Sequence, residues 1–175
     1  MRKFSLRGRI EGVQAASPAE DQVIFSYESS DLTRGWKVTG FHLWFSKARD
    51  WSGTSLKGLQ FVSLFGKLQT DTIGNSDLNA SDNREFAWMS NTYFCNQKSD
   101  LGAQVNALIQ RNTWGVTDPD HVIVRELLLS VGMHTSSDHE SAEMDVSYLI
   151  EIEEFKVTPT ETVLQIVKGT GQSVS

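Results

Sequence analysis

The residues best suited to chemistry lie in one polar loop, positions 134 to 145, which holds two histidines among four carboxylates. Imidazole and carboxylate groups are ligands of divalent cations, so His134, Asp138 and His139 could bind a metal and support a small metal-dependent enzyme. Their spacing matches neither an EF-hand nor an HExxH helix. An acidic, solvated loop explains the same residues more simply, and we expect no metal and no other cofactor.

The familiar catalytic motifs are missing from the chain. GxSxG, GxxxxGK[ST] and GxGxxG do not occur, which removes support for a nucleophile-elbow hydrolase, a P-loop enzyme and a dinucleotide-binding enzyme. Glu151 and Glu153 share a strand face, where a glycosidase pair is conceivable, but a polar outer face accounts for them better. The single cysteine, Cys95, has no partner and is expected to be a small buried side chain. We predict that the protein is not an enzyme.

Five tryptophans offer another kind of chemistry, the stacking of sugar rings. Most are expected in the core, but "ARDWSGTS" places Trp51 in a polar, loop-like setting. Trp51 and Trp114 are therefore the candidate contacts of an alternative function, a carbohydrate-binding (lectin-like) β-sandwich module.

Charge is distributed unevenly along the chain, whose net charge is −6. Four of the 16 basic residues, Arg2, Lys3, Arg7 and Arg9, lie in the first nine positions, which contain no acid; 12 basic and 22 acidic residues follow. The acidic remainder of the chain is expected to repel phosphate, so we expect at most peripheral contact with nucleic acid. The basic segment, residues 1 to 12, could contact nucleic acid or an acidic neighbouring subunit, although a solvated terminus is the simpler interpretation.

The elements that must position these residues are mainly strands of one domain spanning 1 to 175, since no repeat or linker divides the chain. Segments rich in β-branched and aromatic residues predict strands at 3–13, 22–29, 36–46, 59–69, 85–94, 121–132 and 146–157. Long polar stretches at 70–83 and 134–145 are expected loops, and "DPDH" at 118–121 is an expected turn. No apolar run is long enough for a membrane span, and the N-terminus has no signal-peptide core. The pattern predicts an antiparallel, jelly-roll-like β-sandwich.

Three segments carry finer expectations. "VIVRELLLSV" is apolar at both parities, which predicts a central strand covered on both faces. The alternation in "VSYLIEIEEFKV" changes phase after Glu154, which predicts a bulge or a change of sheet there. "DLGAQVNALIQRN" has helix-like apolar spacing and is interpreted as a short helix.

The clearest helix signal closes the chain, in "TPTETVLQIVKG". Thr158 and Glu161 form a capping box around Pro159, and Gly169 is expected to end the helix, giving a helix at 158–169 and a tail at 170–175. Its apolar stripe consists of Val163, Leu164, Ile166 and Val167. So short a helix needs a docking partner, which is either its own sandwich or another subunit.

The C-terminal third, "DPDHVIVRELLLSVG" followed by "VSYLIEIEEFKVTPTETVLQIVKG", resembles the ends of virion structural proteins of small non-enveloped viruses and bacteriophages. The resemblance implies a capsid-type jelly roll that forms homo-oligomers, contacts other virion proteins, and resides in the virion after synthesis in the host cytoplasm. We therefore expect a non-enzymatic protein that assembles into a capsid or a capsid-associated spike or vertex complex.

Overall fold

Eight strands and one helix make up the part of the chain that the computed structural model describes, residues 2–15, 20–26, 33–46, 59–73, 77–96, 108–136 and 143–172. The strands are β1 (Lys3–Gln14), β2 (Glu20–Ser26), β3 (Arg34–Phe45), β4 (Leu59–Gln69), β5 (Glu85–Asn96), β6 (Leu108–Thr117), β7 (Glu126–Thr135) and β8 (Glu143–Lys156). The helix is α1 (Pro159–Gln172). No helix among these residues is long and apolar enough to cross a membrane.

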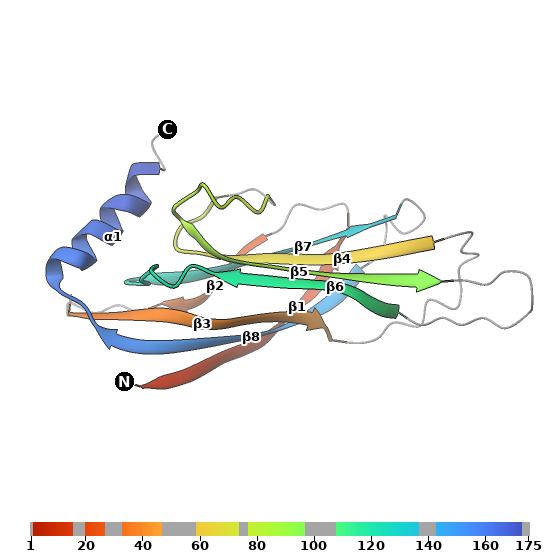
Figure 1. Cartoon of the computed structure of the whole chain (residues 1–175), viewed down its shortest axis with the longest axis horizontal. Coiled ribbons are helices and arrows are strands. Elements are labelled where there is room, and N and C mark those ends of the chain that lie inside the picture. The colour runs from red at the N-terminus through yellow and green to blue at the C-terminus, as the bar shows by residue number, and fades with distance from the viewer. Residues whose placement is uncertain are drawn as a thin grey trace, which may run out of the picture.

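The strands form two antiparallel sheets that pack face to face, with α1 at one end of the elongated sandwich (Figure 1). One sheet has the order β1-β8-β3 and the other β2-β7-β4-β5-β6. The pairs β1–β8, β2–β7 and β4–β5 nest inward along the chain, and β1 to β4 alternate between the sheets. This is the wrapping of a jelly roll, so the predicted fold class is confirmed.

One pair departs from that nesting, because β6 pairs with β5 and not with β3. Side chains of β5 occupy the free edge of β3. The amide of Leu43 donates to Sδ of Met89 at 3.1 Å, and its carbonyl accepts a hydrogen bond from Nδ2 of buried Asn91 at 2.6 Å. These bonds tie the two sheets together where a ladder would otherwise run.

The core lies between the sheets, and β7 is its central strand. Residues 127 to 133 of β7 are all buried, which confirms the expectation of a strand covered on both faces. From β8, Met144, Val146, Ile150 and Ile152 point into the same core. The turn predicted at 118–121 is also present, with Oδ1 of Asp118 accepting from the amide of Asp120 at 2.9 Å.

Two local predictions were wrong. The short helix predicted at 100–112 is contradicted at residues 108 to 112, which begin strand β6 because they pair with β5; residues 100 to 107 lie outside the described ranges. The bulge expected in β8 lies in its partner β3, where the register shifts between Val38 and Gly40 while β8 continues. The expected loop at 134–145 is also shorter, since β7 extends to Thr135 and β8 begins at Glu143.

Helix α1 begins where the capping box predicts. The Thr158 amide donates to Oε2 of Glu161 at 2.8 Å, and the Glu161 amide donates to Oγ1 of Thr158 at 3.3 Å. The helix continues past Gly169 to Gln172, because Gly169 keeps a helical backbone; among described glycines only Gly12 has a positive φ. Glycine costs a helix about 1 kcal/mol without ending it.

Candidate functional site

The apolar stripe of α1 points away from the sandwich. Val163, Leu164 and Val167 are 50%, 55% and 59% exposed, whereas the polar Thr162 is only 2% exposed. Ile166 is half-buried at the boundary between the two sides. A surface helix ordinarily turns its apolar side to the core. Here the orientation is reversed, and no described residue covers Val163, Leu164 or Val167.

A hollow of about 310 Å³ separates part of α1 from the sandwich. Gln165 and Ile166 form its helix side, and the opposite walls come from the start of the β4–β5 loop and from the segment before β7, residues Thr70, Asp71, His121, Val122, Val124, Arg125 and Glu126. A smaller neighbouring hollow shares His121 and Gln165 with it. The helix is therefore held by few direct contacts on this side.

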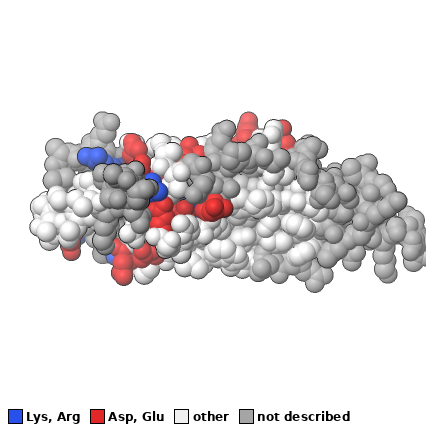
Figure 2. All heavy atoms as spheres, turned by 90° about the horizontal axis from the view of Figure 1, so that it is seen from above, with Lys and Arg blue, Asp and Glu red and all other residues white. Residues whose placement is uncertain are grey.

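Charge around the helix is mainly acidic. The two hollows are lined by a single basic residue, Arg125, and by six acidic residues, Asp71, Asp82, Glu85, Asp118, Asp120 and Glu126. Figure 2 shows acidic side chains gathered toward the α1 end of this face, next to uncharged surface. At the start of α1, hydrogen bonds from the Thr158 backbone and hydroxyl lower the pKa of Glu161.

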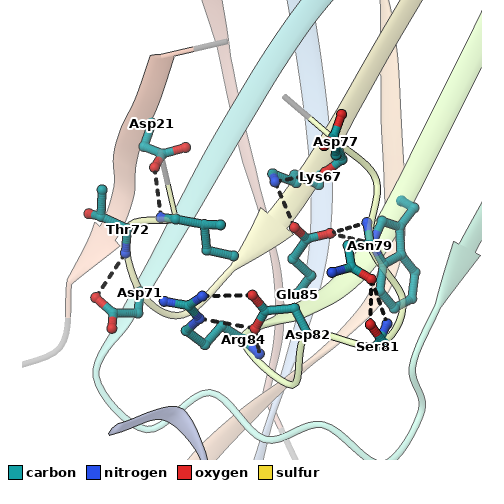
Figure 3. A network of polar contacts seen from close by, with 12 residues as sticks. Asp21, Lys67, Asp71, Thr72, Asp77, Asn79, Ser81, Asp82, Arg84 and Glu85 are labelled. Atoms are coloured by element: carbon teal, nitrogen blue, oxygen red, sulfur yellow. Dashed lines mark hydrogen bonds and ion pairs between the residues drawn. The ribbon is translucent and has the colours of Figure 1, made fainter. Parts of the chain in front are cut away.

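The loop from β4 to β5 is fastened by buried charges (Figure 3). Nζ of Lys67 lies 2.6 Å from Oε1 of Glu85, and both side chains are 1% exposed or less. Lys67 also donates to the carbonyl of Asp77 at 2.9 Å. Oε2 of Glu85 accepts from the Asn79 amide and from Nε1 of Trp88, both at 2.8 Å. These groups satisfy one another and are closed to solvent, so their role is structural.

A second, more accessible ion pair lies in the same loop. Arg84 donates to both carboxylate oxygens of Asp82, at 3.0 and 2.7 Å. This side-chain hydrogen bonding lowers the pKa of Asp82 and raises that of Arg84. The pair shapes the loop and does not form an unusual acid or base.

The basic N-terminal residues lie in or beside strand β1. Nζ of Lys3 is 3.3 Å from Glu153, and Arg9 pairs with Asp145 and, at 3.7 Å, with Glu11. Arg2 and Arg7 are exposed. Contact with nucleic acid or a neighbouring subunit remains a prediction for all four, and Lys3 and Arg9 would first have to exchange these partners.

Of the other predicted site residues, only His134 and Trp114 have described side chains, and they lie on different strands, β7 and β6. His134 is exposed on β7 and stacks on Phe65 with 4.8 Å between ring centroids, whereas Asp138, His139 and Trp51 lie outside the described residues, as does the side chain of Cys95. In the described part, no group of three or more His, Cys, Asp or Glu side chains is placed to hold a metal. Trp114 is 42% exposed on β6.

Sequence reasoning missed an exposed tryptophan, Trp44, which is 43% exposed on β3. The signal was available, because Trp44 and His42 have the opposite parity to the core residues Phe41 and Leu43.

No protein-family model and no curated protein matches the chain. Among solved structures, it is similar to VP1 of Trichodysplasia spinulosa-associated polyomavirus, determined in complex with sialylated glycooligomers, with 10% sequence identity and a TM-score of 0.34. The match covers 86% of this chain and 77% of VP1. Similarity at this level carries no argument about ligand or function, and the fold assignment above depends on the strand order alone.

Proposed function

We propose that the protein is a non-enzymatic virion structural protein that self-associates through the outward face of α1, formed by Val163, Leu164 and Val167 with Ile166 at its edge. The single observation that carries the proposal is the outward orientation of this apolar stripe. Burying a large apolar side chain contributes about 1.5 to 3 kcal/mol, so a few such residues repeated at every contact can hold an assembly together.

The fold is compatible with this function but does not decide it. Jelly rolls serve as viral capsid domains and as lectins, and a fold alone does not establish a function. A second exposed apolar pair, Trp114 and Val116, lies on one face of edge strand β6, at 42% and 56% exposure. The neighbouring valine makes protein contact a better role for Trp114 than sugar stacking. Trp114 thus adds to the assembly proposal and not to the lectin alternative.

In this proposal the product is a capsid or a capsid-associated spike or vertex complex, formed with other virion proteins after synthesis in the host cytoplasm. The exposed Arg2 and Arg7 of the N-terminal segment are the residues left for contact with a neighbouring acidic subunit or with nucleic acid.

The test is light scattering after size-exclusion chromatography, with negative-stain microscopy, on the whole chain and on Leu164→Glu. The original protein should form ordered oligomers or shells, and the variant should be monomeric with an unchanged melting temperature. Thr160→Glu, an exposed change on the polar side of α1, is the matched control and should assemble normally. A protein that stays monomeric at high concentration, or a Leu164→Glu variant that assembles normally, would overturn the proposal.

A further inference from the structure

The outer face of the β1-β8-β3 sheet presents Trp44 in a row with polar residues. Three strands contribute one residue each to a row across the sheet. Ser147 of β8 is paired with Arg9 of β1 on one side and with Trp44 of β3 on the other. Because neighbouring strands lie about 4.8 Å apart, the row places the backbones of Arg9 and Trp44 about 10 Å apart with Ser147 between them.

The polar groups of this row are already fixed in position. Oγ of Ser147 lies 2.6 Å from Oγ of Ser46, and the Ser46 amide donates to the carbonyl of Asp145 at 2.8 Å. Arg9 pairs with Asp145, whose other oxygen accepts from the Gly12 amide at 3.3 Å. The acceptor, donor and hydroxyl groups are held by these bonds, so a ligand would not have to order them.

Next to this row, His42 is exposed on the same face as Trp44. Flat aromatic surface beside fixed donors and acceptors suits a polyhydroxylated ring, whose C–H face can stack on an indole while its hydroxyls bind Asp145, Arg9 and Ser147. The charge of Arg9 is offset by Asp145 and Glu11, so the site has no excess of positive charge to select an anionic ligand.

From this arrangement we infer a shallow saccharide-binding site for neutral sugars, with Trp44 as the stacking platform and Arg9, Asp145 and Ser147 as the hydroxyl-binding groups. The site is independent of self-association. Strand β3 ends at the opposite end of the sandwich from α1 (Figure 1), so a saccharide on Trp44 and a subunit on α1 need not compete.

The experiment measures binding of maltotriose, cellotriose, mannotriose and lactose by tryptophan fluorescence and by saturation-transfer NMR, with sialyllactose as the acidic comparison. At least one neutral sugar should bind with a Kd on the order of 1 mM, the affinity typical of a few hydrogen bonds and one stacking contact. Trp44→Ala should weaken binding at least tenfold, Trp44→Phe should retain part of it, and Ser147→Ala should weaken it severalfold.

Trp114→Ala is the matched control, because Trp114 is exposed to almost the same extent and is also paired with a serine, Ser90, but has apolar Val116 beside it on its own strand. It should leave binding unchanged within twofold. The inference is overturned if no neutral sugar binds at 20 times that Kd, if only sialyllactose binds, or if Trp114→Ala removes binding that Trp44→Ala leaves intact. Repeating the titration on the monomeric Leu164→Glu variant separates this result from the outcome for assembly.

Discussion

The β4–β5 loop and helix α1 have opposite patterns of burial. At the loop, Lys67 and Glu85 are almost completely buried, although charged side chains ordinarily stay in water. On α1, Leu164 and Val167 are more than half exposed, although they are apolar. The same protein therefore buries a lysine side chain and exposes a leucine side chain.

The two regions differ in whether the unusual side chains have partners within the chain. Both buried charges are hydrogen-bonded within the chain. Lys67 donates to the Asp77 carbonyl, and Glu85 accepts from the Asn79 amide and the Trp88 indole. The exposed part of the α1 stripe is covered by no described residue. The buried charges are thus compensated within one subunit. The exposed apolar side chains of α1 would be buried if a second subunit packed against them.

The largest expected effect is the loss of the buried pair. Lys67→Met leaves the Glu85 carboxylate buried without its cation and should reduce the free energy of unfolding by about 3 to 5 kcal/mol, measured by urea denaturation. Lys3→Met is the matched control, because it breaks an ion pair whose lysine is 74% exposed, and it should cost at most about 1 kcal/mol. Equal losses in the two variants would contradict the structural role given to the loop.

A smaller loss is expected where β5 closes the edge of β3. Asn91→Leu keeps a side chain of similar length and branching but leaves the Leu43 carbonyl buried without its donor, which should cost about 1 to 3 kcal/mol. Thr92→Val, which removes the half-buried hydroxyl contact with Ser63, should cost less. If Asn91→Leu were as stable as the original protein in the same urea titration, the two sheets would not depend on this bond.

The strands and the fold class could be predicted from the sequence to a useful degree, whereas the order of the strands and the orientation of the parts could not. Strand β4 begins and ends at the predicted residues because its apolar and aromatic residues stop at a polar stretch, whereas residues 108 to 112 of β6 were taken for part of a helix because their pairing with β5 is non-local. The capping box predicted the start of α1 for a local reason, the reach of Glu161 back to Thr158.

The site itself was only half predictable. The stripe on α1 is readable at helical spacing, but its outward orientation depends on Thr162 packing against the sandwich. Lys67 gave no signal of burial, since its partners come from a loop ten and eighteen residues later. The exposure of Trp44 could be predicted from its parity in the strand. Its place in one row with Arg9 could not, because that row depends on the pairing of three strands.

The next effect concerns the attachment of α1. Thr158→Ala removes the N-cap and should cost about 0.5 to 2 kcal/mol, seen as faster amide hydrogen exchange at the start of α1. Thr160→Ala is the control. Thr160 lies two residues after Thr158 and is exposed, so its substitution should leave exchange unchanged. If capping is irrelevant to the helix, the two variants will exchange alike.

Acid should loosen the same end of the helix. The pKa of Glu161 is lowered in the folded protein from its ordinary value of 4.5 by hydrogen bonds from Thr158. A lowered folded pKa means that the contribution is fully present above pH 4.5 and is lost as the pH falls through the folded pKa. The protection of the first amides of α1, corrected for the intrinsic pH dependence of exchange, should therefore fall in this window, and Glu161→Gln should remove this loss of protection.

Substitutions on the exposed face of α1 should have the smallest effect on stability and the largest effect on assembly. Sedimentation velocity over a concentration series tests this assembly role most directly. Val167→Glu on α1 and Val23→Glu on β2 are the same substitution at sites exposed to 59% and 56%. Each should change the free energy of unfolding by at most about 0.5 kcal/mol. Only Val167→Glu should abolish association, while Val23→Glu associates like the original protein; association that survives Val167→Glu, or that both variants lose equally, would contradict an assembly surface on α1.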